Sequence, residues 1–208
     1  MTKVITIGRQ FGSAGHDIGE LIAKELGFKF YDKELVEMAA KKENISADTI
    51  KEVDEKATSS LLYSLASGSF SLRGVSGPLY YEMPLNDKLF IAQSDIIKTV
   101  AKSENCVIVG RCADYVLEDE EGIDLYNVFV HAPLTFRTAR VMAALGLSEK
   151  HARERIIKTD KQRKTYYNYY SNRDWGKLTN YDIAVNTYKL GIENSARFIA
   201  QCVKEING

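Results

Sequence analysis

The sequence has few cysteines, and their spacing is not that of a disulfide framework. Only Cys106, Cys112 and Cys202 occur in 208 residues. An odd number without a CxxC pair argues against a disulfide scaffold and against a zinc site. His131 and His151 lie at no metal-ligand spacing from cysteines or acidic residues, so no metal site built from side chains is expected. These absences favour a reducing compartment, and we expect the cytoplasm.

The sequence also lacks a long apolar run and an excess of charge of one sign. Lys plus Arg and Asp plus Glu are equal, at 28 each. Overall charge therefore gives no reason to expect long nucleic acid as a partner. The first letters, MTKVITIG, contain too short an apolar run for a signal peptide or a membrane span. We expect a small-molecule ligand at a local charged site, and no membrane.

What is present is an alternation of short apolar runs with helical spacing. Strands are expected at 4–7, 28–31, 106–110, 126–131 and 181–185. Helices are expected over 18–26, 33–66 with a break at 44–46, 86–103, 134–144, 148–170 and 192–206, and a flexible loop over 67–84. This order predicts one α/β domain over 1–208, a three-layer fold with a parallel sheet of about five strands flanked by helices.

The strongest local signal is the glycine-rich segment 8–19, between the first expected strand and helix. The backbone amides of such a turn, with the positive end of the helix, bind phosphate without particular side chains. The P-loop pattern GxxxxGK[ST] is not met, because Gly15, His16 and Asp17 occupy the region of its GK[ST] end, without the lysine and the hydroxyl residue. The alternative is a turn without a ligand.

The missing lysine leaves the terminal phosphates of a nucleotide without a point charge. Arg9, Ser13 or His16 are candidates to compensate for it, whereas Asp17 would repel an anion unless a metal ion lay between them. The residues predicted to contact the nucleotide are Gly8, Arg9, Gly12, Ser13, Ala14, Gly15, His16 and Asp17.

Three segments together resemble the cytidylate kinase-like family: GRQFGSAGHDIG at 8–19, YDKEL at 31–35 and VIVGR at 107–111. The similarity runs nearly end to end, and is closer to a divergent branch than to cytidylate kinases that keep the loop lysine. It implies a P-loop, nucleoside monophosphate kinase-like fold, with a helical substrate-side insertion at 33–103 and a helical lid at 148–178. It also implies ATP and Mg²⁺ as cofactors, and phosphoryl transfer to a small acceptor such as CMP or dCMP.

The resemblance also implies roles for particular residues. Arg111 directly follows an expected central strand, at the sheet edge where open α/β folds bind ligands. It resembles the arginine that grips the acceptor phosphate, and the alternative is a surface ion pair. Asp32 either shapes the acceptor pocket or caps the helix after it. The predicted catalytic residues are Arg111, Lys158 and Arg163, and the predicted substrate-binding residues are Asp32, Arg111 and Asp160.

Several alternatives stay open. Arg140 and Lys161 are each interpreted as part of a solvated helix face. Four tyrosines between 166 and 170 are too closely spaced to face one way on a helix, which favours core packing or a homo-oligomer surface over base stacking with nucleic acid. A catalytically silent nucleotide-binding protein and a small-metabolite kinase are the two rival functions.

Overall fold

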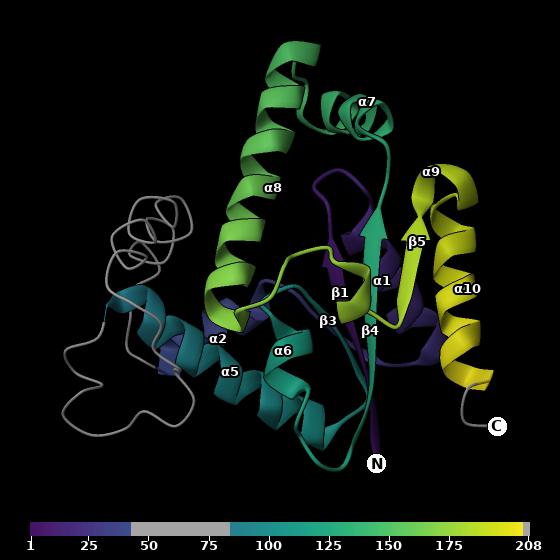
Figure 1. Cartoon of the computed structure of the whole chain (residues 1–208). Coiled ribbons are helices and arrows are strands. Elements are labelled where there is room, and N and C mark those ends of the chain that lie inside the picture. Colours follow the sequence, from purple (N-terminus) through teal and green to yellow (C-terminus); the bar gives the residue numbers. More distant parts are fainter. Residues whose placement is uncertain (43–83, 206–208) are drawn as a thin grey trace.

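The strands lie side by side in one sheet, with the order β2-β3-β1-β4-β5 (Figure 1). The computed structural model describes residues 1–42 and 84–205. The strands are β1 (Thr2–Arg9), β2 (Lys29–Tyr31), β3 (Cys106–Val109), β4 (Ile123–His131) and β5 (Ile183–Asn186). All four neighbouring pairs are parallel, which confirms the predicted parallel α/β fold.

The helices follow the strands in the order that the sequence predicted. They are α1 (Gly15–Leu26), α2 (Glu34–Lys42), α5 (Leu85–Ser103), α6 (Ala113–Leu117), α7 (Leu134–Leu145), α8 (Glu149–Ser171), α9 (Thr187–Leu190) and α10 (Ile192–Glu205). The helices α6 and α9 were not predicted. The expected helix beyond Lys42, the break at 44–46 and most of the expected loop at 67–84 fall outside the described residues. Within the described ranges, no helix is both long and apolar enough to cross a membrane.

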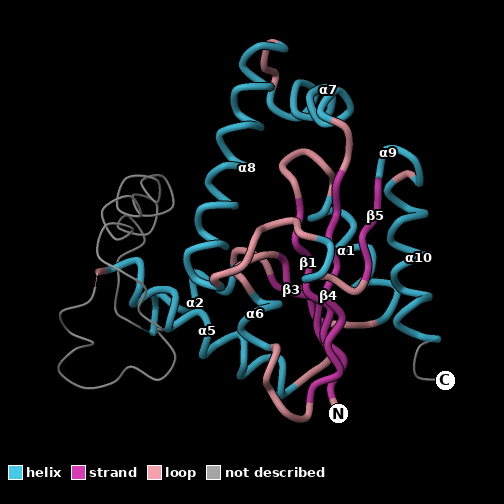
Figure 2. The backbone as a smooth tube through the Cα atoms, viewed as in Figure 1, coloured by secondary structure: helices cyan, strands magenta, loops and turns pink. Residues whose placement is uncertain are grey.

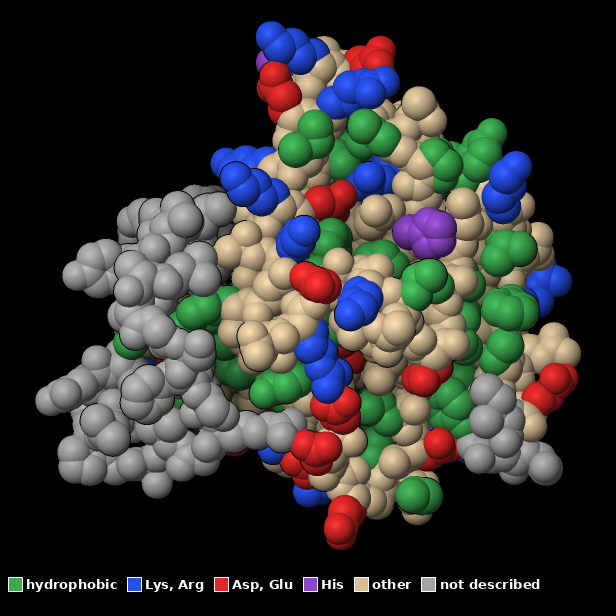
Figure 3. Space-filling view, viewed as in Figure 1, with side chains coloured by type: hydrophobic (Ala, Val, Ile, Leu, Met, Phe, Trp, Pro, Cys, Tyr) green, Lys and Arg blue, Asp and Glu red, His purple; other side chains and the backbone are tan. Residues whose placement is uncertain are grey.

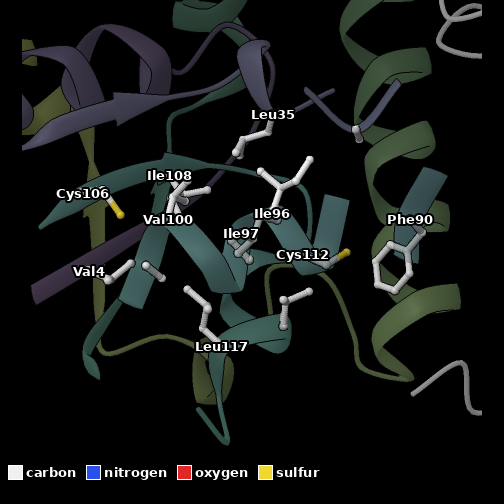
Figure 4. Close-up of a cluster of buried hydrophobic side chains, with 14 of the residues drawn as sticks. Val4, Leu35, Phe90, Ile96, Ile97, Val100, Cys106, Ile108, Cys112 and Leu117 are labelled. Atoms are coloured by element: carbon white, nitrogen blue, oxygen red, sulfur yellow. The ribbon is translucent and has the colours of Figure 1, made fainter. Parts of the chain in front are cut away.

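The side chains of the central strands alternate between two buried faces, as expected for strands covered on both sides. Val4 and Ile108 point into a cluster with α5 and α6, part of which Figure 4 shows. Ile5 and Ile7 point the other way, into a cluster with α1 and α10. All four side chains are fully buried. The short apolar runs in the sequence are therefore the centre of a three-layer structure.

The helix α5 belongs to this core. Its residues Ile97, Val100 and Ala101 lie in the same buried cluster as Val4. The carboxyl-terminal part of the predicted insertion at 33–103 therefore covers the sheet directly. Leu35 of α2 lies in the cluster as well, so both described ends of that segment are attached to the main body.

The carboxyl-terminal part of α8 is also packed into the core. Tyr167 and Tyr170 are buried, and the ring of Tyr170 stacks on Phe90 with 4.0 Å between centroids. Tyr166 and Tyr169 pack against the same cluster from partly buried positions. These contacts confirm the core-packing interpretation of the tyrosines.

Because all the strands are parallel, their carboxyl ends meet at one edge of the sheet. The loops after β1 and β3 begin at this edge. The helices α7 and α8 extend beyond it, as the tube in Figure 2 shows. The predicted ligand-binding segments therefore share one end of the molecule.

Candidate active site

The loop after β1 presents main-chain amides at the sheet edge. Gly12 has φ +80° and Ala14, which precedes α1, has φ +68°. Two residues with left-handed backbone conformation therefore bend the chain before the helix begins. Ala14 contributes no side-chain cap. The amides of the first helical turn have no acceptor within the helix, and the helix dipole adds positive charge there. A turn of this geometry can bind an anion such as phosphate.

The loop is held in place from behind. The hydroxyl of the fully buried Ser13 lies 2.8 Å from the carbonyl oxygen of Gln10 and 3.0 Å from that of Val130. The hydroxyl of Thr187 donates to the carbonyl of Ser13 at 3.0 Å. The Ser13 side chain thus faces the protein interior, and the phosphate contact predicted for it would require it to leave both acceptors. The Thr187 contact joins segments 174 residues apart, so sequence analysis missed it.

Arg9, the last residue of β1, turns its side chain across the sheet edge. One guanidinium nitrogen lies 3.8 Å from Oδ1 of Asp32, and the two side chains are 19% and 13% exposed. Burial lowers the pKa of the Arg9 guanidinium, and the positive charges of Arg163 and Arg111 lower it further against the opposing effect of Asp32. Arg9 is therefore a cation whose charge is poorly compensated.

The turn after β3 brings Arg111 to the same place. Gly110, Arg111 and Cys112 have φ of +77°, +60° and +54°, three successive left-handed residues. Such a conformation is strained for residues other than glycine. The charge of Arg111 lowers the pKa of both Arg9 and Arg163, which places the three arginines together. The structure thus unites the predicted residues Arg9, Arg111 and Arg163.

Arg163 of α8 reaches the loop directly. Its Nη1 donates to the carbonyl oxygen of Arg9 at 2.9 Å, and its guanidinium lies 5.5 Å from the ring centroid of Phe11. Burial is the largest cause of the lowered pKa of Arg163, and Asp160 and Asp32 oppose it. The predicted lid helix is therefore in contact with the glycine-rich loop after β1.

Asp160 and Arg137 form a buried connection between α8, α7 and the loop. Asp160 accepts from the amide of Phe11 at 2.7 Å and from Nη1 of Arg137 at 2.6 Å. Arg137 also donates to the carbonyls of Phe11 and Ala132. Both oxygens of Asp160 are thus engaged inside the protein. A contact of Asp160 with substrate stays a prediction, and its present bonds shape the loop.

Asp17 and Arg140 form an ion pair at the start of α1. Nη2 of Arg140 lies 2.7 Å from Oδ2 of Asp17. The pairing offsets the negative charge that would otherwise repel an anion at this helix end. The interpretation of Arg140 as part of a solvated face is wrong, because its side chain reaches Asp17 and its Nε is buried.

Asp32 faces the site. Its Oδ2 lies 2.9 Å from Nδ1 of His16, and its Oδ1 faces Arg9. The backbone amide of Asp32 binds the side chain of Glu34 at 3.1 Å. Of the two interpretations of Asp32, the contacts support a role at the site more than helix capping. His16 is half-exposed and also lies 3.5 Å from Glu20.

A model of the cytidylate kinase-like family matches residues 4–189. The chain belongs to the cytidylate kinase-like family. A curated relative, the cytidylate kinase of Desulfurococcus amylolyticus, is 31% identical over 114 residues, which are 53% of this chain and 58% of that protein. The match thus spans less than two thirds of that cytidylate kinase. The family resemblance drawn from the three sequence segments is confirmed.

Solved structures show the same fold as this member of the cytidylate kinase-like family. An uncharacterized protein from Eubacterium ventriosum has a TM-score of 0.70 at 27% identity, covering 98% of this chain and 99% of that one. Shikimate kinase from Bacteroides thetaiotaomicron has a TM-score of 0.55 at 14% identity, with coverage of 97% and 98%. A gluconokinase from Sinorhizobium meliloti has a TM-score of 0.51 at 14% identity, covering 99% of this chain and 98% of that one. The two named kinases establish a kinase-like fold and nothing finer.

Lys158 lies apart from the arginines. It is exposed on α8, and five residues along a helix turn a side chain about 140° away from Arg163. Lys161 is exposed too, as expected for a solvated face. Figure 3 shows Lys and Arg side chains along the α8 side of the molecule. The catalytic role predicted for Lys158 therefore requires a movement of α8.

The carboxylates near the loop do not fit a magnesium ion held by the protein. Mg²⁺ is usually bound by carboxylates and substrate phosphates. Here Asp17 pairs with Arg140, Asp160 pairs with Arg137, and Asp32 faces Arg9 and His16. Among the residues that the structure describes, no group of three or more His, Cys, Asp or Glu is arranged to hold a metal ion.

Proposed function

We propose that this chain transfers the γ-phosphoryl group of ATP to a small acceptor that itself carries phosphate, with CMP or dCMP as the first candidate. The arginine cluster, defined as Arg9, Arg111, Arg137 and Arg163, is the observation that carries the proposal. Burial lowers the pKa of Arg9 and of Arg163, and neighbouring arginines of the cluster lower both further. A bound polyphosphate would offset this repulsion between the guanidinium groups.

The roles divide along the sheet edge. The amides from Gly12 to Asp17 would hold the donor phosphates at the start of α1, together with the main chain of Gly8 and Arg9. Arg111, at the end of the neighbouring strand β3, would bind the acceptor phosphate through its guanidinium fork. Asp32 follows β2 and would accept hydrogen bonds from the base or sugar of the acceptor.

Charge stabilisation and positioning would supply the catalysis, so no nucleophilic side chain is needed. Arg163 would stabilise negative charge that develops on the transferred group. Lys158 would join it if α8 closed over the substrates. Magnesium would arrive with the nucleotide phosphates rather than on protein carboxylates. We place the reaction in the cytoplasm, where the buried free thiols Cys106 and Cys112 would stay reduced.

Release of ADP, measured by a coupled assay over a panel of nucleoside monophosphates, tests the proposal. Turnover with CMP or dCMP above the ATP-only background is expected. No turnover with any monophosphate would contradict the acceptor class, and turnover with a hydroxylated metabolite instead would identify a small-metabolite kinase. Calorimetric binding of ATP without transfer to any acceptor would support the silent nucleotide-binding alternative, which the missing loop lysine favours.

A further inference from the structure

The space beside Gly15 is already filled by another side chain. A Cβ atom built on Gly15 would lie 2.5 Å from Cβ and 2.9 Å from Cγ of Arg9. Real Cβ atoms do not come that close to a neighbouring carbon, so a larger residue at position 15 and the present Arg9 exclude one another. In the P-loop pattern the glycine at position 15 directly precedes the lysine, whose place His16 takes here. Arg9 thus occupies room that the glycine leaves.

A second glycine makes room for the other end of Arg9. A Cβ atom on Gly110 would overlap Nη1 of Arg9, so the guanidinium lies directly against the turn after β3. The side chain therefore extends from the donor loop on β1 to the acceptor-side turn that carries Arg111. Two glycines, in segments far apart in the chain, accommodate one arginine.

Among the residues that the structure describes, no anion lies close to the Arg9 guanidinium. Within the described part of the chain its one carboxylate contact is Asp32, and at 3.8 Å this is too long for a hydrogen bond. Arg111 and Arg163 are its cationic neighbours. A mostly buried guanidinium without a close acceptor is costly, and a bound phosphate would offset that cost with charge-assisted bonds.

The other two candidates for the missing charge are engaged elsewhere. The hydroxyl of Ser13 is buried against main-chain carbonyls. The imidazole of His16 binds Asp32 through Nδ1 and lies near Glu20 through Nε2, so both ring nitrogens face carboxylates. Of the candidates Arg9, Ser13 and His16, Arg9 is the one whose side chain has no hydrogen-bonding partner among the described residues.

We propose that Arg9 takes the place of the P-loop lysine, holding the terminal phosphate of the nucleotide between the donor loop and Arg111. This inference rests on the proposed function and adds the residue that completes its donor site. The cation enters from the strand rather than from the helix. A planar guanidinium binds two phosphate oxygens at once, whereas a lysine ammonium acts as a point charge.

Calorimetry with tripolyphosphate, ADP and a non-hydrolysable ATP analogue, each with and without EDTA, tests the inference on the full chain. Arg9→Gln is expected to weaken binding of all three by about 10- to 100-fold, the loss of charged hydrogen bonds. Arg197→Gln is the matched control, since Arg197 is exposed on α10 and its loss removes the same charge. Thermal unfolding of each variant verifies that it is folded.

A swap of the cation supplies a test by rescue. Arg9→Gln combined with His16→Lys restores the lysine that the P-loop pattern places after Gly15, and binding is expected to return to within about tenfold of wild type. Gly15→Ala alone is expected to reduce binding, because its Cβ would displace the Arg9 side chain.

The outcomes separate the two proposals. If wild type binds neither ATP analogue nor tripolyphosphate, the proposed function fails and this inference fails with it. If wild type binds them and Arg9→Gln binds equally well, only the role of Arg9 is overturned. Weakened binding in Arg9→Gln, without rescue by the swap in a folded double variant, also overturns the claim that Arg9 stands in for the P-loop lysine.

Discussion

Asp160 of α8 and Arg137 of α7 meet at 2.6 Å in a buried ion pair, with side chains 17% and 9% exposed. The same carboxylate accepts from the amide of Phe11. One carboxylate, through two hydrogen bonds, therefore joins both helices beyond the sheet edge to the loop. The sequence suggested that Asp160 contacts substrate, whereas its observed contacts support the loop.

The pair predicts a large stability effect. Asp160→Ala leaves Arg137 buried without its partner and should lower the free energy of unfolding by about 3–5 kcal/mol. Urea unfolding monitored by circular dichroism measures this. Glu149→Ala is the control, because its i,i+4 pair with Arg153 is exposed and should contribute less than about 1 kcal/mol. Equal losses in the two variants would argue against a supporting role for Asp160.

Arg111 provides a test of the acceptor side. Arg111→Asn removes the charge but keeps a residue that tolerates φ +60°. The KM for the acceptor monophosphate should rise about tenfold or more, while calorimetric affinity for the ATP analogue stays near the wild-type value. Arg197→Asn serves as the charge control. An equally large loss of affinity for the ATP analogue would show that Arg111 does not act on the acceptor alone.

Gly110 and Gly122 form a matched pair for the Arg9 pocket. Their φ angles are +77° and +82°, but a Cβ on Gly122 would meet nothing within 4 Å, whereas one on Gly110 would overlap Arg9. Alanine at either position should cost about 1–2 kcal/mol of stability from the backbone. Only Gly110→Ala should also weaken tripolyphosphate binding in calorimetry. Unchanged binding in a folded Gly110→Ala would place the Arg9 head away from the ligand.

Asp114 predicts a pH dependence of stability. Burial raises the pKa of this carboxyl above its ordinary value of 3.8, and the hydrogen bond from Tyr167 opposes the rise. The folded state therefore holds the proton more tightly than the unfolded state. The stability that Asp114 contributes is present below pH 3.8 and is lost as the pH rises through its folded pKa.

Asp114→Asn removes this titration. Urea unfolding from pH 4 to pH 7 should show wild type losing stability relative to the variant as the pH increases. Asp95→Asn, at an exposed position paired with Lys42, is the comparison at the surface. A wild-type-minus-variant difference that does not change with pH would contradict a raised pKa at Asp114.

The sequence predicted the order of strands and helices well, because each depends on a local pattern. The short β-branched run at 4–7 and the helix stop at Gly27, observed with φ +68°, are properties of neighbouring residues. The short helices α6 and α9 were missed, since four or five residues are too few to show a helical period.

The site was predicted less completely, and the reason is distance along the chain. Glycine, arginine and aspartate could be named as candidates from the loop and strand ends. The pairs Asp17 with Arg140 and Arg137 with Asp160 could not, because they join segments 123 and 23 residues apart. Lys158 was grouped with Arg163 by sequence proximity, whereas the helical turn separates them.

The two glycines around Arg9 bear on how such proteins are recognised. A cation supplied by the strand leaves no lysine in the contiguous loop, so a pattern search confined to that loop would class the chain as deficient. Its signature is instead distributed: an arginine at the first strand end, a glycine at the helix start and another after the third strand. Loss of one charged residue from a motif thus need not mean loss of the charge.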